Sequence, residues 1–285
     1  MSYLLLDYLP VLDFYNKIKP FLSDDYTSYF SSLQAKGDKS VVYMAAIEFV
    51  LLLFFITALI KTPSLSQRKI VNKLSVSKII SYGKVNLFSY FGSIKEIRKI
   101  EVVVTSENSE LELARLSSTS ISGRVRYMAA LKDEFDDIVH DSLYESVKNY
   151  KVSKNKSRYF KLGTCIVSPP FELVKYDVKC VIHAVSVQKK DDNSIVQDDY
   201  ATKRILSYVI NHCIENSYSS VFIPIFGIGS AQGHVKESVL AQLDSLKIII
   251  DNEMERCNSR LDVYLGVYRE LDDLMLKKTL VSTFK

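Results

Sequence analysis

Twenty consecutive residues, Val41–Ile60 (VVYMAAIEFVLLLFFITALI), carry a single charge, that of Glu48. As an α-helix this segment would be about 30 Å long, which matches the hydrocarbon thickness of a bilayer. It begins too late for a cleaved signal peptide, and no small-residue cleavage pattern follows it. The sequence therefore predicts a membrane-spanning helix over 41–61. The alternative is a buried core helix in which Glu48 has a polar partner.

The charges around this segment predict its orientation. Residues 1–40 carry four Lys and five Asp, residues 61–84 carry six Lys or Arg and no acid, and residues 85–285 carry 27 charges of each sign. The net charge of +4 is therefore −1 before the span, −1 within it and +6 directly after it. Because basic residues stay on the cytoplasmic side, we expect a single-pass protein of the cell membrane whose C-terminal part is in the cytoplasm. The stretch 62–84 is interpreted as a basic juxtamembrane linker beside anionic headgroups, and the balanced charge after it argues against nucleic-acid binding.

Two features of the N-terminal part bear on a membrane function. A lone carboxylate in hydrocarbon needs a partner or water, so Glu48 is a candidate functional residue facing the interior of a bundle of several copies. The alternative is a harmless position near the interface. Residues 1–40 begin with an apolar stretch that Asp, Lys and Pro interrupt. This pattern predicts an extracytoplasmic segment that lies at the interface or packs against another subunit.

Four cysteines occur without C-x-x-C spacing: Cys165, Cys180, Cys213 and Cys257. They lie mostly in apolar segments, which is typical of reduced core residues in a cytosolic domain. The sequence therefore predicts neither a metal site nor disulfides.

From about residue 85 onward, short β-branched runs alternate with helical patterns. Such runs are typical of buried strands, and they lie at 99–106, 164–168, 177–187, 219–226 and 261–268, with an edge strand expected at 85–91. Strands separated by helices predict an α/β fold: a three-layer α/β/α domain over 85–285 with a mixed, mostly parallel sheet. Such sheets bind ligands beyond the carboxyl ends of their strands.

Three helices are expected between these strands, because apolar residues recur on one face at spacings of three and four. The first face consists of Val125, Met128, Leu131, Phe135, Ile138 and Val139. The second consists of Ala201, Ile205, Leu206, Val209, Ile210 and Cys213. The third consists of Val235, Val239, Leu243, Leu246, Ile250 and Met254.

A glycine-rich loop connects the strand at 219–226 to the third helix. Three of the nine glycines of the chain lie in it: Gly227, Gly229 and Gly233. Glycine permits positive φ and brings backbone amides close to a ligand, and the helix N-terminus adds a positive dipole end, so the loop can hold a pyrophosphate. The alternative is a tight turn that binds nothing. The loop is neither a Walker loop nor a G-x-G-x-x-G fingerprint.

The segments CVIHAVSV, DDYATKRILSYVINHCIENS, SSVFIPIFGIGSAQG and LDVYLGVY resemble the second half of a macro domain, the ADP-ribose-binding α/β/α module. That family has a similar strand carrying His, then a helix, a strand ending in Pro and a small residue, and a G-x-G loop. The resemblance covers residues 85–270 and is weaker in its first half. There Gly92-Ser93-Ile94 stands where the family has Gly-Asp-Ile, whose Asp contacts the adenine amino group.

Two further motifs depart from the family. VVVTSENS (102–109) stands where the family has a strand running into Asn-Ala-Ala-Asn, and ISGRVRYMAAL (121–131) stands where it has a run of glycines. Family hydrolases use these residues to place a water and the distal ribose, whereas only Asn108 and Gly123 remain here. The second loop also has one extra residue between Gly229 and Gly233. The resemblance therefore implies a nucleotide cleft more than catalysis, and we expect no catalytic residues and no resident cofactor.

The resemblance implies a site for ADP-ribose or a conjugate of it. The predicted nucleotide-binding residues are Ser93, Ile94, Ser106, Asn108, Gly123, Arg124, Val125, Phe226, Gly227, Ile228, Gly229, Ser230, Ala231, Gln232, Gly233, His234 and Tyr268.

Several of these side chains have a second interpretation. Arg124 supplies a charge-assisted contact to the ligand or is an exposed first-turn arginine. Phe226 stacks on the ligand or fills the core, and Tyr268 lies beside the nucleotide or is a rim tyrosine. His183 is interpreted as a satisfied core histidine rather than a base. His234 is the better candidate to contact ligand.

Three functions fit this sequence. The architecture resembles the membrane-spanning macro-domain effectors of Thoeris-type anti-phage systems, in which a TIR-domain enzyme consumes NAD to make an ADP-ribose-derived signal. It implies a homo-oligomeric, non-catalytic sensor that perturbs the membrane. The second possibility is a membrane-tethered ADP-ribosylhydrolase. The third is a structural membrane protein whose cleft is vestigial.

Overall fold

The computed structural model describes residues 74–285 except 155–158, 190–194, 197, 229–234 and 255–258. The span expected at 41–61, its Glu48 and residues 1–40 lie outside the described residues. Within the described ranges, no helix is both long enough and apolar enough to cross a membrane.

The centre of the fold is a mixed β-sheet with the strand order β1-β2-β10-β9-β3-β7-β6. The inner strands β2, β10, β9, β3 and β7 run parallel, whereas β1 and β6 pair antiparallel at the two ends. The strands are β1 Ser75–Tyr82, β2 Val85–Phe91, β3 Val102–Asn108, β6 Cys165–Ser168, β7 Cys180–Lys189, β9 Ser220–Pro224 and β10 Leu261–Val267, and β8 Ile195–Val196 pairs with β7. The mixed, mostly parallel sheet predicted from the sequence is confirmed.

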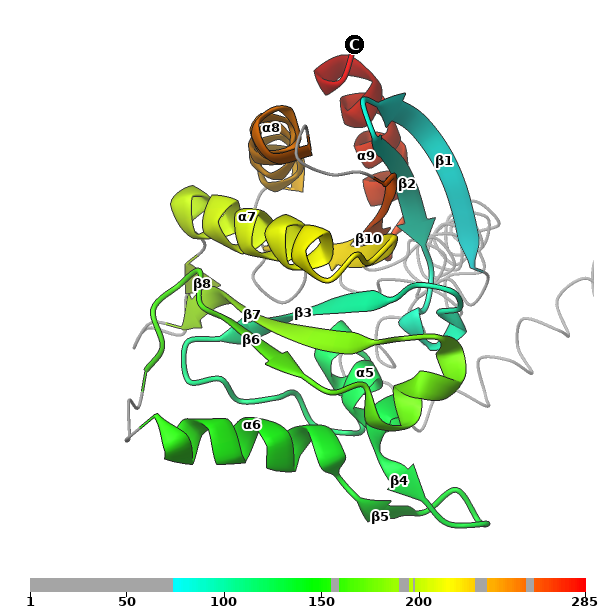
Figure 1. Cartoon of the computed structure of the whole chain (residues 1–285), viewed down its shortest axis with the longest axis vertical. Helices are drawn as coiled ribbons and strands as arrows, with labels where there is room; N and C mark the ends of the chain where they lie inside the picture. The colour runs from blue at the N-terminus through cyan, green and yellow to red at the C-terminus, as the bar shows by residue number, and fades with distance from the viewer. Residues whose placement is uncertain (1–73, 155–158, 190–194, 197, 229–234, 255–258) are drawn as a thin grey trace, which may run out of the picture. The chain divides into compact units, whose positions relative to one another are not determined.

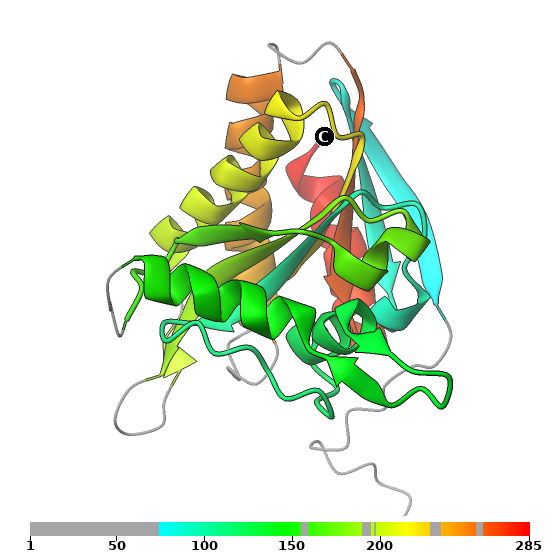
Figure 2. The ribbon, with the colours of Figure 1, turned by 60° about the horizontal axis from the view of Figure 1, so that its bottom comes forward.

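Helices cover both faces of this sheet (Figure 1). On one face lie α7 Asp199–Glu215, α8 Val235–Glu253 and α9 Glu270–Thr283. On the other lie α5 Ile121–Ala129 and α6 Ser142–Ser153, with the short 3-10 helices η2 Ile94–Glu96 and η3 Phe171–Tyr176. The turned view shows the same three layers (Figure 2).

Successive side chains of a strand point to opposite faces of the sheet, so each inner strand contributes to a hydrophobic core on both faces. In β3, Val102 and Val104 pack in the cluster that contains α7, α8 and α9, whereas Val103 packs in the cluster that contains α5. All three side chains are fully buried. A strand that is apolar on both faces is typical of a parallel sheet covered by helices on both sides.

The helical patterns at 201–213 and 235–254 predict their helices correctly. All six residues of the α7 face, from Ala201 to Cys213, are buried. On α8, Val239, Leu243, Leu246 and Ile250 are buried, as is Met254 directly after the helix, and Val235 is half-buried against the same core. Burial of an apolar stripe stabilises such helices more than their intrinsic propensity does.

The helical interpretation of 125–139 is wrong beyond α5, which ends at Ala129. Strands β4 (Leu131–Lys132) and β5 (Ile138–His140) form a hairpin instead. The Asp133 carboxylate accepts hydrogen bonds from the amides of Phe135 and Asp137, each at 2.9 Å, so its side chain fixes a turn that competes with a helix. The Phe135 side chain is 78% exposed and does not belong to a core face.

The sheet also extends into the stretch interpreted as a linker. Strand β1 pairs with β2 over 75–91, so β2 is an inner strand and not the expected edge strand. The two are joined by a two-residue turn in which Gly83 has φ +58°, a conformation that favours glycine.

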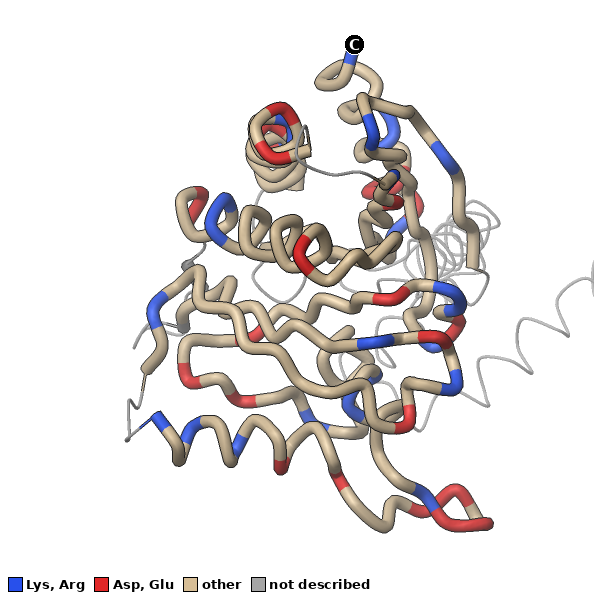
Figure 3. The backbone as a smooth tube through the Cα atoms, viewed as in Figure 1, with Lys and Arg blue, Asp and Glu red and all other residues tan. Residues whose placement is uncertain are grey.

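Basic and acidic residues both occur throughout the described part of the chain. Acidic positions gather in the hairpin between β4 and β5, and basic positions follow one another in the second half of α6, whereas both signs occur elsewhere along the described backbone (Figure 3).

We expect Gly266→Ala to destabilise the fold. A Cβ at this buried position of β10 would lie 2.6 Å from Phe222 Cε2 and would force the ring to move. Overpacking of this kind costs about 1–3 kcal/mol of unfolding free energy. Urea denaturation followed by circular dichroism measures it, with Ser75→Ala on the exposed edge of β1 as control. Equal midpoints for the two variants would contradict the packing around Phe222.

Candidate functional site

The carboxyl ends of β2, β10, β9, β3 and β7 meet at one edge of the sheet, because these strands are parallel. Polar or glycine residues follow several of them. Ser93 follows β2, Tyr268 follows β10, Gly227 follows β9, and Glu107 lies near the end of β3. An edge of this kind is where α/β sheets bind ligands.

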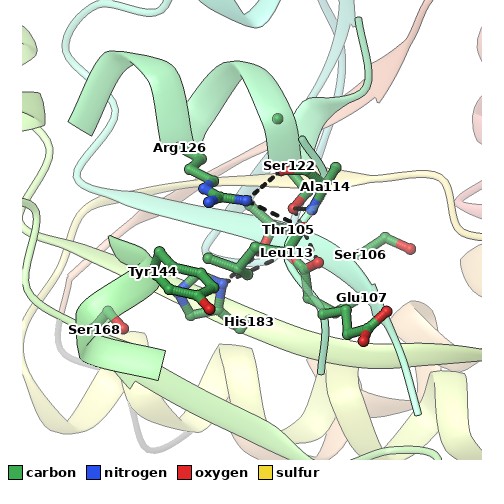
Figure 4. Close-up of polar contacts among 12 residues, drawn as sticks. Thr105, Ser106, Glu107, Leu113, Ala114, Ser122, Arg126, Tyr144, Ser168 and His183 are labelled. Atoms are coloured by element: carbon green, nitrogen blue, oxygen red, sulfur yellow. Dashed lines mark hydrogen bonds and ion pairs between the residues drawn. The ribbon is translucent and has the colours of Figure 1, made fainter. Parts of the chain in front are cut away.

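A buried polar cluster lies between β3, β7 and the start of α5, and Glu107 is its member closest to this edge (Figure 4). Glu107 and His183 are 2% and 1% exposed. Thr105 Oγ1 lies 3.1 Å from His183 Nδ1, and the same nitrogen lies 3.6 Å from Glu107 Oε1, too far for a direct hydrogen bond. The Ser122 hydroxyl, in the first turn of α5, donates to Glu107 Oε2 at 2.9 Å. The cluster thus fastens the start of α5 to the end of β3.

Three buried side-chain atoms in the described part of the chain have no hydrogen-bond partner: Glu107 Oε1, His183 Nε2 and Tyr268 Oη. A buried polar atom without a partner costs roughly 1–3 kcal/mol. Such a cost is unusual in a folded domain and is typical of groups reserved for a ligand or an ordered water. Glu107 lies in β3, His183 lies in β7, and Tyr268 directly follows β10.

The β2–β10 end of the edge is rich in hydrogen-bond donors. The Arg124 guanidinium donates to Ser93 Oγ, which also accepts from the amide of Lys95 at 3.2 Å. The Tyr90 hydroxyl donates to the Ser93 carbonyl at 3.1 Å. Burial, reinforced by the nearby Tyr90, raises the pKa of Tyr268, while Arg124 acts in the opposite direction. The Tyr268 hydroxyl therefore keeps its proton at neutral pH and can donate it.

The residues after β3 form a fixed turn. Asn108 Oδ1 accepts hydrogen bonds from the amides of Glu110 and Glu112, at 3.1 and 3.0 Å. This oxygen therefore holds the chain locally. Asn108 was predicted to contact nucleotide, and its amide oxygen already has two partners in this arrangement.

The segment Glu110–Ser120 is then fastened to α5. Arg126 donates to the carbonyls of Leu113 and Ala114, at 3.3 and 2.9 Å, and pairs with Asp141 at 2.7 Å. Ser122 Oγ accepts from the amide of Ala114 at 3.2 Å. These side chains fix the segment against the start of α5, which lies in the stretch 121–131 where the resemblance led us to expect a run of glycines.

Gly123 and Arg124 both lie in the first turn of α5. Gly123 donates its amide to Ser120 Oγ, the N-cap of the helix. A Cβ on Gly123 would lie 2.6 Å from the Arg115 carbonyl oxygen and 2.7 Å from Ser118 Cβ. Glycine at this position therefore lets the segment Glu110–Ser120 lie close to the helix. This packing requirement alone accounts for Gly123, without contact to a ligand.

Several predicted contact residues lie in the core. Ile94, Val125 and Phe226 are 0–1% exposed. For Phe226 this is the core-filling interpretation left open by the sequence. Ser106 lies 2.6 Å from Ser186, hydroxyl to hydroxyl, on the neighbouring strand.

The start of the glycine loop is buried and anchored. Gly227 has φ +77°, and the Ile228 carbonyl accepts from Arg269 Nη2 at 3.0 Å. The amide of Phe226 donates to the buried Gln242 side chain at 3.0 Å. The other predicted loop residues lie outside the described residues: Gly229, Ser230, Ala231, Gln232, Gly233 and His234.

Sequence reasoning missed Glu107 and assigned His183 to the core alone. The available signal was an acid, Glu107, three residues after Val104 in the same strand, where a buried strand seldom carries a charge. His183 is buried as expected, but its Nε2 has no hydrogen-bond partner, so the interpretation as a satisfied core histidine holds only in part.

Cysteine and metal chemistry find little support in the described ranges. Burial raises the pKa of Cys180 to about 11 and that of Cys165 to about 12, so both thiols are protonated at neutral pH. No group of three or more His, Cys, Asp or Glu side chains in these ranges is arranged to hold a metal ion.

We expect Ser122→Ala to lower the free energy of unfolding by about 1–3 kcal/mol, because it leaves Glu107 Oε2 and the Ala114 amide without their partner. Urea denaturation measures the loss. Ser117→Ala is the matched control, since Ser117 is exposed on the same segment. A loss below 0.5 kcal/mol, within the range of surface substitutions, would show that this hydroxyl does not connect the elements.

Comparisons with known proteins agree with this architecture. No protein-family model matches the chain, and neither does any curated protein sequence. Among solved structures, the Oceanobacillus iheyensis macrodomain with ADP matches with a TM-score of 0.57 at 14% identity, over 74% of this chain and 97% of the other. A variant of the same macrodomain with ADPR matches with a TM-score of 0.55 at 15% identity, over 73% and 98%. The Trypanosoma brucei macrodomain matches with a TM-score of 0.50 at 9% identity, over 71% of each chain.

Identities this low show the fold and leave activity open. The strand order, the helical layers and the coverage of the matched chains agree with one architecture. The described part of this chain therefore has the macrodomain fold.

Proposed function

We propose that the described domain binds an ADP-ribose-type nucleotide at the carboxyl edge of its sheet. The observation that carries this proposal is the pair of buried atoms without hydrogen-bond partners on Glu107 and Tyr268 at that edge, with a third on His183 beside Glu107. Macrodomains of the same fold that are found with ADP and with ADPR support the choice of ligand. The glycine loop after β9 would bind the diphosphate through its backbone amides.

The domain acts as a sensor in this proposal rather than as a hydrolase. A hydrolase needs a side chain within reach of its attacking water. The carboxamide oxygen of Asn108, the remaining asparagine of the expected motif, is already held by two backbone amides. Glu107, the buried acid nearby, has one oxygen bound to Ser122 and the other enclosed beside His183. This arrangement favours binding over turnover.

The full chain would be a membrane-anchored effector in anti-phage defence. The apolar stretch 41–60 and the basic residues after it support an anchor with the macrodomain in the cytoplasm. One helix cannot enclose a pore, so several copies would assemble on binding an ADP-ribose-derived signal, with Glu48 facing the interior of their bundle. A TIR-domain enzyme that consumes NAD would supply the signal, and the response would perturb the bilayer.

We expect the full chain, purified in detergent, to bind ADP-ribose in a calorimetric titration. Gly229→Arg should abolish binding, because a bulky cation would block the approach of the diphosphate to the loop amides. Ser75→Arg adds the same charge on the exposed edge of β1 and should leave the affinity unchanged. Absence of binding by the wild-type chain would refute the nucleotide proposal.

We also expect the chain to stay in the membrane pellet after alkaline carbonate extraction. Replacing Leu52 and Phe55 with Asp should release it, since each acid at the centre of a span costs about 2.5–3.5 kcal/mol. The control pair Leu52→Ile and Phe55→Leu keeps the segment apolar. Recovery of the wild-type chain in the supernatant would rule out the anchor.

A further inference from the structure

Strand β6 forms one end of the sheet and, in the described part of the chain, pairs only with β7. The strand at the other end, β1, carries Lys78 and a register shift beside it, and both features hinder pairing with another chain. Strand β6 (CIVS) has no charged residue, and its register with β7 is regular. Its Val167 side chain is 38% exposed. This side of the sheet is therefore open to a further strand.

A polar groove lies beside the start of β6. Its volume is about 440 Å³, and it is lined by Gly163 and by one stripe of α7 that extends from Arg204 to Glu215. A Cβ on Gly163 would lie 3.3 Å from Arg204 Cβ, so the chain that enters β6 lies directly against the start of α7. Ligand pockets are mostly apolar, whereas this lining is mostly polar and charged. The groove therefore suits a protein surface better than a small molecule.

Helix α7 runs in the same direction as β6. At the start of both, Gly163 lies against Arg204. At the end of both, Cys180 Sγ lies 3.8 Å from His212 Nε2, and the next residue of β7 pairs with Ser168, the last residue of β6. The charges of α7 therefore follow a defined order along the open strand.

The stripe of α7 has opposite charges at its two ends. Arg204 and Glu215 are exposed, and neither forms an ion pair with another described residue. Glu215 lies eleven residues after Arg204, which places the two about 17 Å apart along the axis and on the same side of the helix. Tyr208 lies between them and is 41% exposed, and its ring centroid is 5.9 Å from that of the stacked His212 ring. An exposed tyrosine held in this way is a typical anchor of a protein interface.

A second copy of the domain carries the charges that this stripe needs. When two β6 strands lie side by side and antiparallel, a two-fold axis relates the copies, and their α7 helices are antiparallel as well. Arg204 of each copy then lies toward Glu215 of the other, so that two ion pairs form. When the two strands are parallel, like charges lie together instead. The order of charges along α7 therefore favours the antiparallel arrangement.

Helix α6 supports the same arrangement from the other face of the sheet (Figure 1). It packs against β6, where the hydroxyl oxygens of Ser146 and Ser168 lie 3.1 Å apart. Its first turn carries Glu145 and its last turn carries Lys151, and the exposed Lys154 follows. Two α6 helices related by the same axis are antiparallel, which brings acidic and basic ends together. Both helices beside β6 are thus self-complementary in charge.

We propose that the surface formed by β6, α7 and α6 is the interface of a homodimer, in which two copies form one continuous sheet with their α7 helices antiparallel. Main-chain hydrogen bonds between two short strands are few, so the helices supply most of the contact, and the Arg204–Glu215 pairs fix the direction. The inference goes beyond the proposed function, because this interface needs neither the nucleotide nor the apolar stretch 41–60.

A zero-length cross-link tests the contact directly. A carbodiimide joins an amine to a carboxylate only where the two meet, and Arg204→Lys supplies an amine without changing the charge. The full chain with this variant, purified in detergent without nucleotide, should give a dimer in which mass spectrometry finds the new amine joined to Glu215. The link cannot form within one chain, because the two positions are about 17 Å apart on one helix.

Arg260→Lys is the matched control for this cross-link. Arg260 is exposed directly before β10, which β9, β3 and β7 separate from β6. The variant makes the same chemical change at a place that the proposed interface does not include. It should give no link to Glu215.

Exchanging the charges gives a second measurement. Arg204→Glu and Glu215→Arg each place like charges together in a homodimer, whereas a mixed dimer of the two variants restores both ion pairs. With a different affinity tag on each chain, mixed co-capture should exceed that of either variant with itself by roughly fivefold. Both positions are exposed, so the fold should be retained. The apolar stretch 41–60 is identical in every combination, so association through it cannot produce the difference.

The two measurements decide the proposal together. A link from the new amine to Glu215 and preferred mixed capture support the dimer. Absence of the link, or equal capture in all combinations, overturns it, and this includes the case in which the surface binds a different protein. The nucleotide proposal is unaffected by any of these results, because both measurements are made without nucleotide.

Discussion

The parallel pairing of β3 with β7 and β9 is the constraint on which the site depends. Val103 lies opposite Val181 on one side and Phe222 on the other, and this register decides the face on which every later residue of β3 lies. A shift by one residue would turn Val103, Thr105 and Glu107 away from α5 and put their neighbours in their place. Because both faces of the sheet are covered by helices, each register error would bury the wrong set of side chains.

The buried cluster joins three parts of the fold, yet it leaves polar atoms without hydrogen-bond partners. Ser122 donates to Glu107 and accepts from Ala114, so one hydroxyl joins β3, α5 and the segment after β3. A domain built for stability alone would also satisfy Glu107 Oε1, His183 Nε2 and Tyr268 Oη. In the proposed function, a ligand that supplies the missing groups would recover the cost of leaving these atoms without partners.

Apolar spacing predicted two helices correctly and a third one wrongly, and local polar contacts explain the difference. The apolar stripes of α7 and α8 are buried along their length, and both helices were predicted from spacing alone. The stripe at 125–139 has the same spacing, yet the Asp133 carboxylate binds two backbone amides and turns the chain into a hairpin. The expected linker likewise ends in a strand, because the Gly83 turn lets β1 fold back along β2.

The sequence by itself determined the layers of the fold and the glycine-containing edge of the sheet, because periodic burial is written into neighbouring residues. It also contains the apolar stretch and the charge asymmetry from which the anchor is proposed. Only the tertiary structure decided that Glu107, His183 and Ser122 meet, since they come from β3, β7 and α5. Long-range pairing brings together residues far apart in the chain, and whether a buried oxygen has a partner depends on neighbours that no local pattern specifies.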